Sequence, residues 1–270
     1  RSGRKVCMND ISFSATSEFL NNLTDWDLSL YGDDSSYQGF IYGEQGGVPH
    51  YFLPVGRGCS LSCSYCAGSL ENQKACYNRP EVVFRSPERV CETIENVIKY
   101  NINHFYICFD PPEISDKWYR KLFSTIRERN LKIGLSFECY DIPSEEFVED
   151  FARTFNLKES RLIFSPTSIS DVVREKFTSQ KYAFGEFEYM LKKCKNLGIN
   201  TSLYFALLPG EDDINWHNYN DKVNWIKAAN SDKLNAIILP IMVEPGAPWF
   251  ENPQMYNIDL QLTSFRDFYN

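Results

Sequence analysis

Short apolar runs alternate with amphipathic stretches along most of the chain, from about residue 51 onward. The apolar runs are rich in Val, Ile, Phe and Tyr and end at Gly, Pro, Asp or Ser, a pattern typical of strands that are buried on both faces of a sheet. Six of these runs are predicted to be strands: 51–55, 104–109, 131–140, 161–165, 199–210 and 234–242.

The segments between these runs carry apolar side chains at helical spacing and begin with typical helix starts. Ser86 precedes a proline at the first helical position, and Ser115 and Ser144 are expected to cap the next two helices. Further helices are expected over 184–197 and 214–229. Strands that alternate with helices in this way favour a parallel sheet with right-handed crossovers.

The fold class predicted from this alternation is α/β, as a partial (β/α)6 TIM-like barrel with parallel strands. Residues 1–50 differ from the rest: they are rich in Gly, Asp, Ser and Tyr, with one short helix expected near 17–23. We interpret 1–50 as an irregular N-terminal extension or linker and 51–270 as the core domain. Functional side chains are expected where the parallel strands end.

Composition narrows the class of protein further. The chain has 270 residues, a net charge of -8 and no stripe of Lys or Arg, so charge does not favour nucleic acid as a partner. No apolar run is long enough to span a membrane, and no signal peptide is recognisable. Because the sequence begins at Arg1, we expect it to be a piece of something longer.

Nine cysteines are present, an odd number; outside one cluster they are scattered, four of them within predicted strands or helices. This usage is typical of the reducing cytoplasm. Three are clustered in the turn after the first apolar run: Cys59, Cys63 and Cys66 form a C-x3-C-x2-C spacing among glycines and serines. The turn follows the first predicted strand, and we therefore expect it at the carboxyl edge of the sheet.

Three interpretations of this cysteine turn are open. The spacing fits one face of a helix, although the glycines and serines disfavour a helix there. A structural zinc site would need a fourth ligand, for which Cys76 is available, but no second C-x2-C pair is present. Three thiolates on a [4Fe–4S] cluster would leave one iron open to bind a small molecule, which explains the missing fourth cysteine.

The cysteine turn resembles that of the radical S-adenosylmethionine (SAM) enzymes. Their signature is the same spacing with an aromatic residue before the third cysteine, here Tyr65. The resemblance covers 51–270 as a radical SAM core. The phrases "FLPVGRGCSLSCSYCAGS", "VVFRSPERV", "FYICFDPP" and "LPIMVEPGAPWFENPQMYNI" are similar to cobalamin-associated members of the family. The cobalamin-binding domain of that group lies N-terminal to the core, and its D-x-H-x-x-G signature is absent from this sequence.

The resemblance implies an enzyme in which SAM binds the open iron of an oxygen-sensitive [4Fe–4S] cluster. An electron, from a donor such as flavodoxin or ferredoxin, cleaves SAM, and the resulting radical abstracts hydrogen from an unknown substrate or starts its methylation. Cobalamin would be supplied by an N-terminal domain of the full-length protein. A non-catalytic zinc or iron–sulfur module and a degenerate radical SAM scaffold are the alternatives.

The resemblance also implies positions for SAM at the ends of the second and third strands. Asp110 and Pro111 lie where the family receives the methionine amino group, although a turn before prolines explains them equally. Glu138 is expected to bind the ribose hydroxyls or the amino group, because a carboxylate in this strand needs a polar cavity or solvent.

Further SAM contacts are implied at the fourth and fifth strands. Ser165 is expected at the ribose, and Leu207 and Leu208 at the adenine, although core packing explains the leucines as well. Thr167 stands where related proteins carry a glutamate. The Pro- and aromatic-rich segment 243–256 would close the barrel mouth, against either the substrate or a neighbouring domain.

Overall fold

The computed structural model describes the backbone over most of the chain. The described residues are 15–25, 28, 50–77, 79, 81–108, 113–208, 216–231 and 233–260, without the side chains of 76–77, 113–115 and 216–219. No helix within these ranges is long and apolar enough to cross a membrane.

Six parallel strands form the central sheet, in the order β1-β4-β5-β6-β7-β8. This confirms the α/β class and the partial barrel that the apolar runs predict. The strands are β1 (His50–Phe52), β4 (His104–Cys108), β5 (Gly134–Cys139), β6 (Arg161–Thr167), β7 (Asn200–Leu207) and β8 (Leu234–Pro240).

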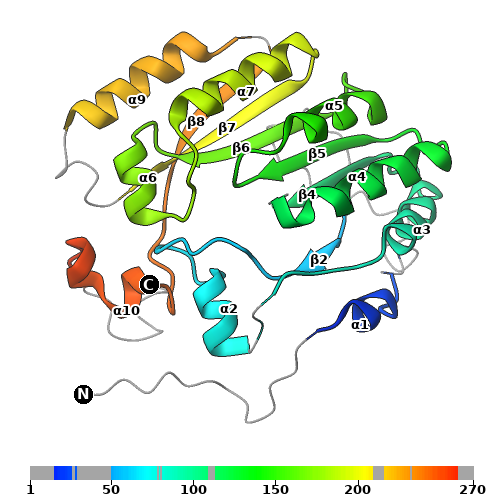
Figure 1. Ribbon diagram of the computed structural model, residues 1–270, viewed down its shortest axis with the longest axis horizontal. Coiled ribbons are helices and arrows are strands. Elements are labelled where there is room, and N and C mark those ends of the chain that lie inside the picture. Colours follow the sequence, from blue (N-terminus) through cyan, green and yellow to red (C-terminus); the bar gives the residue numbers. More distant parts are fainter. Residues whose placement is uncertain are drawn as a thin grey trace.

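Helices cover the outer face of this sheet: one precedes β4, and one follows each of the strands β4, β5, β6 and β7 (Figure 1). They are α3 (Pro87–Ile98), α4 (Glu113–Glu128), α5 (Glu145–Thr154), α7 (Phe184–Asn196) and α9 (Trp216–Ala229). Ser86 and Ser144 cap α3 and α5 as predicted: their hydroxyls accept from Arg89 N at 3.2 Å and Phe147 N at 3.1 Å. The cap expected at Ser115 is wrong, because α4 already begins at Glu113.

Several short elements were not predicted. β2 (Gly56–Arg57) and β3 (Val83–Phe84) form a separate antiparallel pair, and α2 (Leu70–Tyr77) lies between them. The remaining elements are α1 (Ser17–Asn21), close to the helix expected near 17–23, α6 (Asp171–Phe177), α10 (Pro248–Glu251) and the 3-10 helix η3 (Pro253–Tyr256). Apart from α1, these segments are too short or too polar to show a periodic apolar pattern, which is why the sequence did not predict them.

The main core fills the space between the sheet and its outer helices and is dominated by aromatic rings. Tyr119 packs edge-on against Phe137 at 4.9 Å between ring centroids, and Phe123 lies 5.3 Å from Phe147. All four side chains are fully buried. Edge-to-face ring pairs add to the free energy gained from burial, so this core fixes α4 and α5 against β5.

A second, smaller apolar cluster lies at the carboxyl edge of the sheet. Trp249, which is fully buried, packs edge-on against Phe177 of α6 and against Tyr65, each at 5.5 Å between ring centroids. Ala206 and Leu208 complete its buried part on the β7 side. The cluster therefore joins the cysteine loop, α6, the end of β7 and the C-terminal segment.

Part of the expected N-terminal extension packs on the core. Asp25 pairs with Arg89 at 3.1 Å and Arg85 at 3.4 Å and accepts a hydrogen bond from Thr93 Oγ1 at 2.6 Å. Leu28 is buried in the main core. The boundary at residue 50 stays a prediction, although His50 is itself the first residue of β1.

We expect His104 to make the free energy of unfolding fall below pH 6.5. Its imidazole is buried at the start of β4, 3.0 Å from Ser136 Oγ, and burial, aided by the charges of His50 and Arg161, lowers its pKa from 6.5 to about 4. Between these two pH values the unfolded chain binds more protons, so the folded state loses about 2 kcal/mol from pH 7 to pH 4.5.

The measurement is urea unfolding of the protein and of His104→Gln at both pH values. Gln keeps a hydrogen-bonding group near Ser136 but does not titrate, so this variant should lose about 2 kcal/mol less on acidification. Equal losses in the two proteins would show that His104 is not the responsible group.

Candidate functional site: a pocket with three cysteines

The cysteine turn is an irregular loop between β2 and α2, not a helix. Gly58 begins it with a φ of +105°, a conformation that residues with a side chain rarely adopt. A Cβ there would also lie 3.1 Å from the Glu81 carbonyl oxygen. The interpretation of the cysteines as one face of a buried helix is therefore wrong.

The loop is attached to the C-terminal end of α6. Ser64 N and Ser64 Oγ both donate to the Phe177 carbonyl, at 2.9 and 3.0 Å. Ser62 N donates to Ser179 Oγ at 2.9 Å. The loop forms no helix or strand. Two of its backbone amides instead donate to residues more than a hundred positions away in the sequence.

The C-terminal segment holds the loop from a second side. Ala67 N donates to Glu244 Oε2 at 2.8 Å, and Trp249 N donates to the Ser64 carbonyl at 3.0 Å. Asn72 Nδ2, on α2, donates to the Gly246 carbonyl at 2.7 Å. The sequence left open what this segment covers, and the described contacts place it on the cysteine loop and α2.

The three thiols lie close enough to influence one another. Burial raises the pKa of Cys63 to about 12, and the neighbouring Cys59 and Cys66 sulfurs add to the rise. Backbone amides point at the two outer sulfurs: Leu61 N lies 3.4 Å from Cys59 Sγ and Gly68 N lies 3.3 Å from Cys66 Sγ. Amide donors of this kind stabilise thiolates once a metal has displaced the thiol protons.

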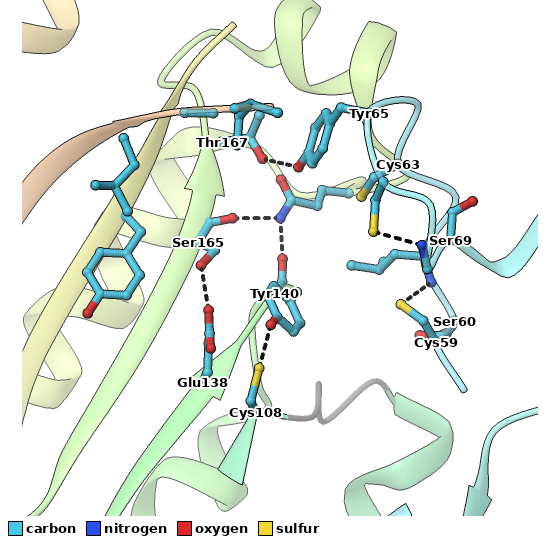
Figure 2. Close-up of a pocket in the computed structure, with 18 of the residues that line it drawn as sticks. Cys59, Ser60, Cys63, Tyr65, Ser69, Cys108, Glu138, Tyr140, Ser165 and Thr167 are labelled. Carbon is cyan, nitrogen blue, oxygen red and sulfur yellow. Dashed lines mark hydrogen bonds between the residues drawn. The ribbon is translucent and has the colours of Figure 1, made fainter. Parts of the chain in front are cut away.

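All three cysteines line one pocket of about 410 Å³. Figure 2 shows Cys59 and Cys63 across the pocket from the strand ends that carry Cys108, Glu138 and Ser165. The lining residues are Gly58, Cys59, Ser60, Leu61, Cys63, Tyr65, Cys66, Gly68, Ser69, Val82, Cys108, Glu138, Tyr140, Ser165, Thr167, Gln180, Tyr204, Phe205, Ala206, Leu239 and Ile241.

Two side chains predicted from the sequence meet at the far wall of the pocket. Glu138 is buried and accepts a hydrogen bond from Tyr106 OH at 2.6 Å. It also accepts one from Ser165 Oγ at 3.3 Å (Figure 2). A buried carboxylate needs such donors. The two hydroxyls fix the carboxylate at the edge of the cavity, where it can accept from a further donor.

Tyr65 and Thr167 meet on the side of the pocket nearest the loop. Their hydroxyl oxygens are 3.2 Å apart, and Tyr65 OH also interacts with the Cys63 thiol. Thr167 has a φ of +62°, which is rare for a β-branched residue, and lies where the pairing of β6 with β7 shifts register. The glutamate expected there from related proteins is replaced by a hydroxyl that contacts the aromatic residue of the signature.

The other predicted residues either lie outside the described part of the chain or do not line the described pocket. Asp110 and Pro111 lie outside the described residues, as does the side chain of Cys76. Leu208 is buried in the small apolar cluster, and neither it nor Leu207 lines the described pocket; Tyr204, Phe205 and Ala206 of β7 line it instead. The contact of the two leucines with adenine stays a prediction.

The structure adds residues that sequence reasoning missed. Cys108 Sγ lies 2.8 Å from Tyr140 OH, across the ends of β4 and β5. Gln180, which is 5% exposed, donates from its amide nitrogen to the carbonyls of Tyr140 and, at 3.0 Å, Ser165. No motif marks Gln180, because its partners come from two strands that are remote in sequence.

The family model of the radical SAM superfamily matches residues 53–222, which is more than half of the chain. The chain belongs to the radical SAM superfamily. The cofactors of this family are a [4Fe–4S] cluster and SAM. No curated protein matches the chain.

Solved structures share the fold at low sequence identity. The radical SAM methyltransferase TsrM from Kitasatospora setae, determined with cobalamin and a [4Fe–4S] cluster bound, has a TM-score of 0.59 and 18% identity over 76% of this chain and 39% of its own. Spore photoproduct lyase, determined with SAM and a dinucleoside spore photoproduct, has a TM-score of 0.56 and 14% identity over 81% of this chain and 64% of its own. This radical SAM chain thus spans less than two thirds of the proteins it resembles.

The donor set of this radical SAM chain fits a cluster better than a single metal ion. Among the described residues, no three His, Cys, Asp or Glu side chains converge closely enough to ligate one ion. Tetrahedral zinc requires thiolate sulfurs about 3.8 Å apart, as zinc–sulfur bonds of about 2.3 Å imply. In a [4Fe–4S] cluster each thiolate binds its own iron, and so three neighbouring thiols around one pocket are sufficient.

We expect Gln180→Glu to destabilise this radical SAM core by about 2–4 kcal/mol. The carboxylate cannot donate, so two buried strand-end carbonyls lose their partner and face a like-charged oxygen. Urea unfolding at pH 7 measures the change, with the exposed Gln254→Glu as the matched control, expected within about 0.5 kcal/mol of the parent. A Gln180→Glu variant as stable as this control would contradict the bridging role.

Proposed function

We propose that this chain is the catalytic core of a radical SAM enzyme whose [4Fe–4S] cluster is held by Cys59, Cys63 and Cys66. The observation that carries the proposal is that all three thiols line one pocket with the polar ends of neighbouring strands. When bound, the cluster supplies the electron that cleaves SAM and starts radical chemistry on the substrate. The protein supplies position and a partly enclosed cavity.

The wall opposite the cysteines supports a SAM site. Glu138 presents a carboxylate fixed by Tyr106 and Ser165, a good acceptor for the ribose hydroxyls or the amino group of SAM. The apolar side chains of Phe205, Leu239 and Ile241 line the same cavity and suit the adenine ring. The cavity is of the size that small-molecule cofactors occupy.

The reaction beyond SAM cleavage is either hydrogen abstraction or methylation. Resemblance in fold to TsrM supports a methyltransferase as one candidate, and the similar fold of spore photoproduct lyase shows that the same core serves other radical reactions. Cobalamin would come from a domain outside this chain. We propose a one-electron donor such as flavodoxin or ferredoxin as the reducing partner.

Replacing any one of the three loop cysteines by alanine should abolish cluster binding. After anaerobic reconstitution, the parent protein is expected to hold about four iron atoms per chain and each variant close to none. Iron and sulfide analysis measures this, together with the visible absorbance that dithionite bleaches. Cys194→Ala, a buried cysteine of α7, is the control and should retain the iron.

Cys76→Ala distinguishes the cluster from a zinc site with four thiols. Full iron content and SAM cleavage in this variant support three ligands and an open iron. A colourless parent protein with one zinc, lost in Cys76→Ala, would instead identify a structural zinc module. A cluster without formation of 5′-deoxyadenosine would identify a degenerate scaffold.

Glu138→Gln should weaken SAM binding by about 10- to 100-fold, because hydrogen bonds to a charged group contribute about 1.5–3 kcal/mol. Equilibrium dialysis of labelled SAM against the reconstituted protein measures the affinity. Glu159→Gln is the control, since Glu159 is exposed and precedes β6 at the opposite end of the strands. If both variants bind SAM equally well, Glu138 is not a ligand.

A further inference from the structure

Residues 244–249, here termed the brace, contact the cysteine loop next to its third cysteine. Glu244 accepts from the amide of Ala67, the residue directly after Cys66, and Trp249 N donates to Ser64. In Figure 1 the segment that carries α10 lies beside α2 and the loop before it. The brace is more than 170 residues away in sequence and so can influence the loop only through the fold.

Glu244 is the charged member of the brace, and its charge is not balanced by a close cation. Within the described ranges no Lys, Arg or His side chain forms an ion pair with it, although the side chain is half-buried. The one hydrogen bond described for its carboxylate is that from Ala67 N, at 2.8 Å. A partly desolvated charge acts on its surroundings more strongly than one in water.

This charge lies close to Cys66. The carboxylate accepts from the amide of the next residue, Ala67, at 2.8 Å, and the amide that follows, Gly68 N, lies 3.3 Å from the Cys66 sulfur. The hydrogen bond has a second effect, because it directs the Ala67 amide at the carboxylate instead of at a sulfur. Fewer amide donors and more negative charge near a cluster both make an added electron less favourable.

We propose, on the basis of the cluster site proposed above, that Glu244 is a positioning residue that lowers the reduction potential of the [4Fe–4S] cluster. Reduction adds one negative charge next to a fixed carboxylate, so the reduced state is disfavoured and its electron is the more strongly reducing. A strongly reducing electron is what cleavage of the carbon–sulfur bond of SAM requires. Glu244 thus adjusts the driving force of the reaction without contacting the substrate.

The test is a redox titration of reconstituted protein without SAM, followed by electron paramagnetic resonance of the reduced cluster. Glu244→Gln retains an acceptor for Ala67 and removes the charge. At a fixed potential it should raise the ratio of reduced to oxidised cluster about tenfold, which for one electron corresponds to a midpoint shift of about 59 mV to more positive values.

Two further variants show whether a change in reduction potential comes from the charge of Glu244 rather than from its side-chain contacts or from any nearby carboxylate. Glu244→Asp keeps the charge and should stay close to the parent potential. Glu251→Gln removes an exposed carboxylate from α10, in the same segment, and should leave the potential unchanged. Hydrogen exchange of the Ala67 amide in the cluster-free proteins shows whether the loop contact is retained in Glu244→Gln.

The outcomes are distinguishable. Equal potentials in the parent and Glu244→Gln, with full iron content in both, overturn the role of Glu244 and leave the cluster site intact. A cluster that assembles in the parent but not in folded Glu244→Gln also overturns it, because the carboxylate would then be needed to hold the iron. A parent protein that takes up no cluster overturns both proposals.

Discussion

Six parallel strands must end at the same edge of one sheet, and the site of this protein depends on that constraint. The pairing of β4 with β5 aligns Cys108 with Glu138, and the pairing of β5 with β6 brings Ser165 beside them. Side chains from three segments separated by about thirty residues each therefore share one wall, since right-handed crossovers return the chain to the same edge. The hydrogen bonds from Tyr106 and Ser165 to Glu138 are a consequence of this register.

The cysteine loop forms the opposite wall of the pocket and is not held by strand pairing. A loop rich in glycine and serine has little regular structure of its own. The end of α6 and the brace provide hydrogen bonds to its backbone, and the small apolar cluster around Trp249 packs beneath Tyr65. This packing places three thiols around one cavity. A binding site held in this way loses less conformational entropy when its cofactor binds.

Local patterns predicted the sheet, most of the outer helices and the cysteine trio, because strand period, N-caps and cysteine spacing are all properties of neighbouring residues. Glu138 and Ser165 were predicted from a resemblance and do meet in the pocket, while Leu208 packs in the apolar cluster. No sequence pattern predicted the contacts of Gln180 and Glu244. Each acts on groups that are distant in sequence, and a glutamine or glutamate alone predicts neither a partner nor burial.

A parallel α/β protein with three thiols in one turn follows from the sequence alone, since alternating apolar periods and the C-x3-C-x2-C spacing are properties of neighbouring residues. The groups that surround those thiols depend on how the whole chain packs. The brace, fixed by the buried Trp249, brings the Glu244 carboxylate next to Cys66. The strand register brings the Glu138 carboxylate to the other side of the cavity. The physical reason is that electrostatic effects and hydrogen bonds act over a few ångströms of space, and only the packed core determines which distant residues come that close.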